Sequence, residues 1–151
     1  MTKTPATRGR AATLLYSAAA VVSLIGLVDA TYLTVEHLTG GTVRCGESLG
    51  CSEVLGSAYA TIGGRFPVAA LGTFAYFTVF SLATLAVFGY TRVQVFLTFI
   101  IAAMFATTLW LFFVQAFILH AFCRYCLLSA AVTLALTAIV IGLRFVRTDA
   151  G

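Results

Sequence analysis

Residues 120–128 read His-Ala-Phe-Cys-Arg-Tyr-Cys-Leu-Leu and stand at the start of a long apolar run. The pattern predicts a helix that begins near the first cysteine, and two thiols at this spacing on a helix start can face each other and close into a disulfide. The partial positive charge of the helix N-terminus and the charge of Arg124 both favour the thiolate form. We therefore expect Cys123 and Cys126 to be a reactive pair.

The composition of the chain indicates a membrane protein. Of its 151 residues, 61% are hydrophobic and 9% are charged, and the mean hydropathy is +1.04. Soluble proteins carry about 25% charged residues, so this chain cannot cover its own surface with polar groups. A single membrane domain over residues 1–151 is expected. The net charge of +4 is typical of a membrane protein whose basic residues set its topology. The sequence has no basic run with interleaved aromatic residues, so a nucleic-acid partner is not expected.

Four apolar segments are separated by glycine-containing or charged connections. They predict transmembrane helices at about residues 13–38, 67–88, 93–119 and 123–145. Residues 1–10 are basic and predict a loosely ordered tail, and the first apolar run is too long for the core of a cleaved signal peptide. Three short connections and one long loop favour an all-α bundle of four transmembrane helices.

The long loop covers residues 39–66 and holds the other two cysteines, Cys45 and Cys51. Apolar residues at 54, 55, 58 and 59 predict a short amphipathic helix that caps the outward face of the bundle. Gly63-Gly64 would end that helix, and Pro67 would lie in the first turn of the next span.

The distribution of basic residues predicts the orientation in the membrane. Four spans put both termini on one side, which would carry six of the nine basic residues. These six are Lys3, Arg8, Arg10, Arg92, Arg144 and Arg147, and the other three are Arg44, Arg65 and Arg124. The positive-inside rule then places both termini in the cytoplasm, and the protein in the inner (plasma) membrane. All four cysteines would face the periplasm or exterior, where disulfides persist.

Several chemistries fit the two cysteine pairs. Exchange between a loop pair and a helix pair would make a thiol–disulfide relay. The loop pair could instead be a structural staple, the helix pair could be buried small residues, or all four thiolates could hold zinc in a non-catalytic scaffold or metal carrier. Asp29 inside the first span is either a functional group or an interfacial one. His120 is either a proton donor or a solvated turn residue.

The order of these motifs resembles the vitamin K epoxide reductase family, in its bacterial quinone-linked branch. The resemblance rests on Cys-x5-Cys in the first outward loop, the run Cys-Ser-Glu-Val-Leu-Gly-Ser over residues 51–57, and Cys-x-x-Cys at the start of the fourth span. It implies that Cys123 and Cys126 are the active-site pair, with Cys126 nearest the quinone. It also implies that Cys45 and Cys51 pass electrons from a partner to Cys123, and that Ser57 supports the site.

Departures from the family pattern bear on the substrate. Animal members carry a tyrosine and an asparagine where this chain has Ala130 and Val68, which removes hydrogen bonds to an epoxide or quinone oxygen. The resemblance therefore implies plain reduction of a quinone of ubiquinone, menaquinone or vitamin K type, and weak epoxide reduction. Phe117, Phe122 and Tyr125 are the aromatic candidates for the quinone pocket. No thioredoxin-like segment follows the fourth span, so a thioredoxin-like donor acting in trans is expected.

Overall fold

The computed structural model describes residues 5–39, 54, 56–63, 66–90 and 92–148. Within these residues, four helices are long and apolar enough to cross a membrane. They are α1 (Pro5–Thr39), α3 (Val68–Val87), α4 (Val93–Phe113), which continues as the π-helix η2 (Val114–Leu119), and α5 (Arg124–Thr148). The predicted all-α bundle of four transmembrane helices is therefore confirmed.

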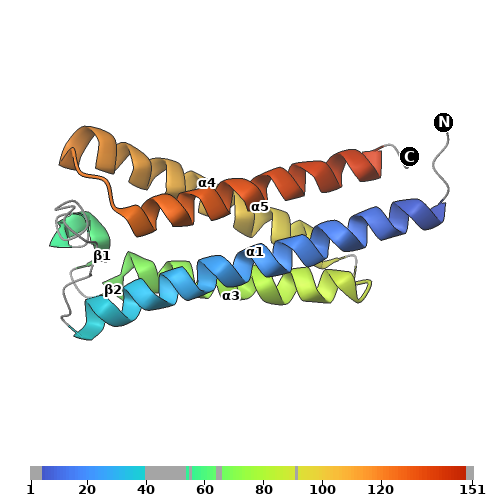
Figure 1. Ribbon diagram of the computed structural model, residues 1–151, viewed down its shortest axis with the longest axis horizontal. Helices are drawn as coiled ribbons and strands as arrows, with labels where there is room; N and C mark the ends of the chain where they lie inside the picture. The colour runs from blue at the N-terminus through green and yellow to red at the C-terminus, as the bar shows by residue number, and fades with distance from the viewer. Residues whose placement is uncertain (1–4, 40–53, 55, 64–65, 91, 149–151) are drawn as a thin grey trace.

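The four helices form a closed ring of neighbours. α1 packs against α3 and α5, and α4 packs against the same two helices from the other side. Both termini lie at one end of the bundle together with the turn between α3 and α4 (Figure 1). The opposite end carries the short elements that precede α3 and the turn that joins η2 to α5. The Cys-x-x-Cys pair, at the start of α5, belongs to this second end.

α1 begins earlier than predicted. Residues 5–10 were expected to be a loose tail, but they form the first turns of the helix, so this prediction is wrong. Pro5 stands at the first helical position, where its fixed φ suits the helix and its missing N–H costs nothing. With 35 residues, α1 is about 50 Å long, which exceeds the roughly 30 Å hydrocarbon layer. The helix therefore projects beyond the lipid.

The segment before α3 is less helical than predicted. Val54 and Gly56 are helical, but Ser57 has an extended backbone and its hydroxyl donates to the Val54 carbonyl at 2.7 Å. A 3-10 turn, η1 (Ala58–Ala60), follows. Strands β1 (Thr61–Ile62) and β2 (Phe66–Pro67) then form a small antiparallel pair. The predicted short helix is thus helical at Val54 and Gly56 and ends in a 3-10 turn, and a hairpin follows it before α3.

The predicted start of α3 is displaced by one residue. Pro67 was expected in the first helical turn, but it has an extended backbone and immediately precedes Val68, the first residue of α3. Its position in β2 pairs it with Thr61, so the strand pair and the helix start meet at this residue. The hairpin turn passes through Gly63, whose φ of +62° lies in the left-handed region that glycine tolerates.

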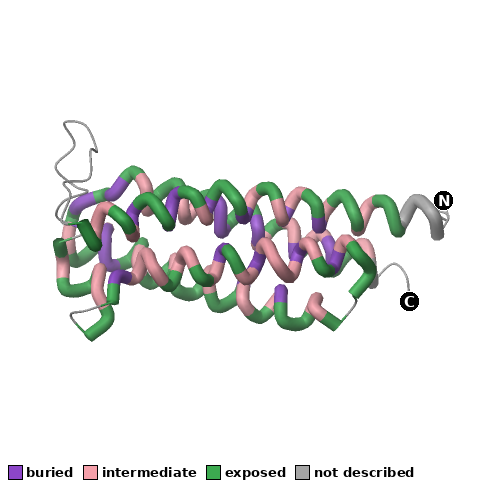
Figure 2. The backbone as a smooth tube through the Cα atoms, turned by 90° about the horizontal axis from the view of Figure 1, so that it is seen from below, coloured by how far each residue is buried: buried purple, intermediate pink, exposed green. Residues whose placement is uncertain are grey.

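Figure 2 shows buried residues spread along the length of the bundle. The largest that are fully buried include Tyr76, Val79, Leu97, Ile101 and Leu136. Outside this narrow core the helices expose many large apolar side chains. Such a surface suits lipid rather than water, because soluble proteins rarely expose contiguous apolar patches of this extent.

Candidate active site

The Cys-x-x-Cys pair stands at the start of α5. Cys123 immediately precedes the helix, and its carbonyl accepts a hydrogen bond from the Leu127 N–H at 3.0 Å. Both thiols are free, Cys123 is fully buried, and Cys126 is partly exposed. Cys123 packs with Val54 and Ala121 in a small apolar cluster that Cys126 also joins. The loop that carries Cys51 thus re-enters the described structure directly against Cys123.

The surroundings of Cys123 lower the pKa of its thiol. A hydrogen bond from the Cys126 thiol, with help from the N–H groups of Cys126 and Tyr125, lowers the pKa of Cys123 from 9.0 to about 7, although burial works against it. The N–H groups belong to the first turn of α5, as expected for a helix start. The Arg124 side chain is exposed to the surroundings. The partner thiol and the helix start therefore activate Cys123.

Gln115 connects the π-helix to the thiol pair. Its carbonyl accepts hydrogen bonds from the N–H groups of His120 and Ala121, which end η2. Its buried side-chain oxygen accepts a hydrogen bond from the Cys123 N–H at 3.1 Å. His120, in the turn between them, is exposed and has a left-handed backbone with φ of 48°. The sequence offered no signal for Gln115, because π-helices have no clear residue pattern.

A cavity of about 560 Å³ lies beside the pair, and Cys126 is part of its wall. This volume falls within the roughly 300–1,000 Å³ of small-molecule sites. The wall is mostly apolar and is built from α1, α3, α4, α5 and the segment before α3. A site of this size and character suits a small apolar molecule.

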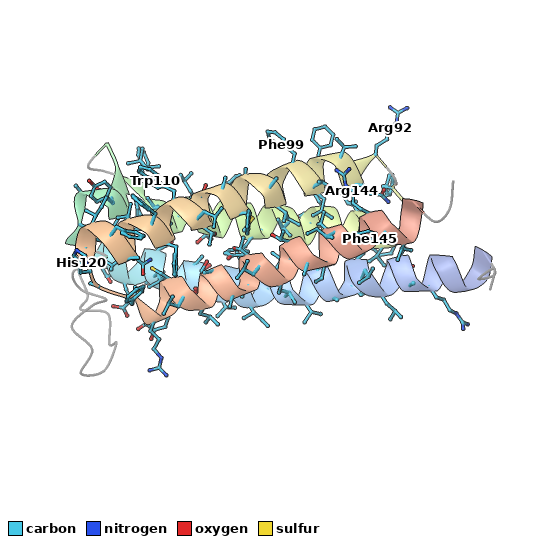
Figure 3. All side chains as sticks on the ribbon, turned by 90° about the horizontal axis from the view of Figure 1, so that it is seen from above. Arg92, Phe99, Trp110, His120, Arg144 and Phe145 are labelled. Carbon is cyan, nitrogen blue, oxygen red and sulfur yellow. The ribbon has the colours of Figure 1, made fainter. Side chains whose placement is uncertain are left out.

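The cavity reaches the exposed surface of α3 and α4. Leu71 of α3 and Phe99 and Trp110 of α4 all line it, and all three are more than half exposed. Figure 3 shows Phe99 and Trp110 along the outer side of α4, between His120 at one end and Arg92 at the other. Because this outer side is apolar, the cavity meets the surroundings that lipid would fill, and an apolar molecule could enter sideways.

Polar side chains are few and gather near Cys126. The hydroxyl of Tyr76 lies 2.7 Å from the Ser129 Oγ and 3.1 Å from the Thr133 Oγ1, and it donates to the Ser129 carbonyl at 3.0 Å. Cys126, Ser129 and Thr133 are spaced three and four residues apart, so they share one face of α5. Asp29 of α1 is buried and also lines the cavity.

The residues named from the sequence fall into three groups. Ser57, Val68 and Ala130 line the cavity with Cys126. The aromatic candidates are not among the residues that line it. Each packs on another aromatic ring instead. The distances between ring centroids are 5.4 Å for Tyr125 and Tyr32, 6.2 Å for Phe122 and Phe112, and 4.9 Å for Phe117 and Phe113. Cys45 and Cys51 lie outside the described residues.

The described part of the chain contains no cluster of three His, Cys, Asp or Glu side chains that could hold a metal ion. The zinc hypothesis needs Cys45 and Cys51, so it stays untested.

A transmembrane four-helix bundle with a free Cys-x-x-Cys pair beside an apolar cavity defines a class of membrane oxidoreductase. The family model for the vitamin K epoxide reductase family matches residues 17–141, a range that includes both cysteine pairs, the second and third spans and most of the first and fourth. The chain belongs to the vitamin K epoxide reductase family, whose members are membrane oxidoreductases that act with quinones. No curated protein sequence matches the chain significantly.

Proposed function

We propose that this protein oxidises the thiols of a thioredoxin-like donor and passes the electrons to a membrane quinone, which supports disulfide-bond formation. The observation that carries this proposal is the position of Cys126 in the wall of an apolar cavity that reaches the lipid-facing side. A quinone supplies an acceptor for two electrons and two protons. The cavity residues would hold the quinone next to Cys126, while Cys123 packs against Val54.

The donor side of the relay is supported by Val54. This residue packs against Cys123, and it follows Cys51 by three positions. Three residues of chain span at most about 11 Å, so the packing of Val54 is compatible with exchange between Cys51 and Cys123. In the proposed relay, the donor reduces the Cys45–Cys51 disulfide, and the Cys51 thiolate then attacks Cys123 and displaces the Cys126 thiolate. Cys45 then attacks Cys51, and both cysteines of α5 are left reduced.

The same arrangement supports one orientation of the protein in the membrane. Arg92 and Arg144 lie at the end of the bundle opposite His120, the end where both termini lie (Figures 1 and 3). We propose that this end faces the cytoplasm, in accord with the positive-inside rule. The thiol pair would then face the periplasm or exterior of a cell bounded by an inner (plasma) membrane, where oxidised donors are needed.

The cavity favours a plain quinone over vitamin K epoxide. Val68 and Ala130 both line it, and neither side chain can donate a hydrogen bond to an epoxide oxygen. We therefore expect epoxide turnover well below quinone turnover with the same donor.

The test is quinone reduction by purified protein in lipid nanodiscs, with either a reduced thioredoxin-like protein or a small dithiol as donor. Cys126→Ala should abolish turnover with both donors. Cys45→Ser should abolish turnover with the protein donor but retain it with the small dithiol, which can reduce Cys123–Cys126 directly. Full turnover in Cys126→Ala would refute the proposed route.

A further inference from the structure

Asp29 is an acidic side chain in an unusual place. It lies in the second half of α1, only 6% of its surface is exposed, and it lines the same cavity as Cys126. Within the described residues, its Oδ2 is buried and has no hydrogen-bond partner. An ionised carboxylate inside a membrane span is costly unless a cation pairs with it. None of the described residues that line the cavity is lysine or arginine, so these surroundings favour the neutral acid.

The carboxyl group shares the cavity wall with Cys126 and influences both thiols. It interacts electrostatically with the thiols of Cys123 and Cys126 and with the hydroxyl of Tyr76. The other titratable side chains that line the cavity are His37, Tyr59, Tyr76 and Cys126. The Tyr76 hydroxyl is already held by Ser129 and Thr133. Among the described residues that line the cavity, Asp29 is thus the one carboxyl group that an acceptor bound next to Cys126 would meet.

Reduction of a quinone requires protons at a place with little water. Two thiols lose two electrons and two protons as their sulfur–sulfur bond forms, and the two quinone oxygens gain the same two electrons and two protons. Part of the Cys123 population has already lost its proton at neutral pH, because its pKa is about 7. A buried acid that gives one proton to a quinone oxygen and regains one from the Cys126 thiol accounts for the first proton. The second comes from water, to which the Cys123 thiol has already released its own, so the step balances.

We propose that the Asp29 carboxyl is a catalytic acid that delivers a proton to the quinone oxygen while Cys126 supplies electrons. This inference rests on the proposed function, since it assigns a role within that reaction. It goes beyond the thiol pairs by placing the proton source on α1, the helix that packs against both α3 and α5.

The experiment compares Asp29→Asn, which keeps the size of the side chain, with Asp29→Glu, which keeps the acid. Three quantities separate the possible roles: quinone affinity from quenching of Trp110 fluorescence, the rate at which a small dithiol reduces Cys123–Cys126, and the rate of hydroquinone formation in a single turnover. Trp110 suits the first purpose because it is the only tryptophan and lines the cavity. Ser23→Ala is the control, because Ser23 is a buried polar residue of α1 that does not line the cavity.

Asp29→Asn should bind quinone within about threefold of the wild type and accept electrons from the dithiol normally, but form hydroquinone about 10²-fold more slowly. Asp29→Glu should recover part of that rate, and Ser23→Ala should change none of the three quantities. Infrared spectra should contain a neutral carboxyl band that disappears in Asp29→Asn.

Each contrary result has a distinct meaning. Normal hydroquinone formation by Asp29→Asn, or the absence of the carboxyl band in the wild type, would overturn the role of Asp29 and leave the quinone reductase intact. Loss of quinone binding in Asp29→Asn would overturn it in favour of a binding role. A wild type that binds quinone and accepts electrons but forms no hydroquinone would overturn the proposed function itself.

Discussion

Replacing Gly26 by alanine tests how tightly the bundle holds Tyr76 beside the cavity. A Cβ at position 26 would stand 2.5–2.7 Å from three atoms of the Tyr76 ring, whereas ordinary contacts measure 3.4–4 Å. The ring or α1 must therefore move by about 1 Å. The ring has little freedom, because it is fully buried and its hydroxyl is held by Ser129 and Thr133 of α5.

The expected loss of stability follows from three contributions. Overpacking of a buried site costs about 1–3 kcal/mol. Movement of the ring weakens up to three hydrogen bonds, each with a net value of about 1 kcal/mol. Alanine in place of glycine in a helix interior returns about 1 kcal/mol. The free energy of unfolding of Gly26→Ala should therefore fall by about 2 kcal/mol.

Reversible unfolding in mixed micelles measures this change, and a double-mutant cycle identifies its cause. If the clash with the ring is responsible, Gly26→Ala combined with Tyr76→Leu should be about 1–3 kcal/mol more stable than the two single changes predict. Gly142→Ala is the matched control, since its Cβ would meet only Leu15 Cδ1 at an ordinary 3.9 Å, and it should be neutral or slightly stabilising. An additive cycle, or equal behaviour of the two alanine variants, would refute the reasoning.

Three further changes probe the site. Cys126→Ala should raise the pKa of Cys123 from about 7 toward 9.0, so that the thiolate fraction at pH 7 falls from about one half to roughly 1%, whereas Cys126→Ser should keep part of the lowered pKa. Ultraviolet absorbance of the thiolate against pH measures this pKa, and an unchanged titration midpoint in Cys126→Ala would contradict the prediction. Gln115→Leu leaves the buried Cys123 N–H without its hydrogen-bond acceptor, so the free energy of unfolding should fall by about 1–3 kcal/mol in the same unfolding assay. Unchanged stability would show that this N–H has another acceptor. Ala130→Phe should fill the cavity wall and weaken quinone binding about tenfold or more, as measured by tryptophan quenching, while Ala131→Phe, on the exposed neighbouring position, should bind normally.

The sequence predicts the helices of this protein well, because length and hydropathy decide whether a segment spans a membrane. The observed start of α5 at Arg124 agrees with the position expected from Cys123. The ends of segments were less predictable. Residues 5–10 extend α1 although they are polar, because nothing in them stops a helix once it projects beyond lipid. The hairpin before α3 depends on pairing across the turn at Gly63, which a helical spacing of apolar residues does not reveal.

Which residues face the cavity was the least predictable part. A span that is apolar on all sides has no polar face to mark its orientation, so nearness in sequence to the motif was the only guide to the aromatic candidates. The π-helix makes that guide weaker still, because a wider turn at residues 114–119 rotates every following side chain relative to a regular helix. Phe117 accordingly packs on Phe113, while Gln115 reaches Cys123. The same irregular turn that hides the site from sequence patterns supplies the acceptor for the Cys123 N–H, so we conclude that the π-helix belongs to the active site and not only to the frame of the bundle.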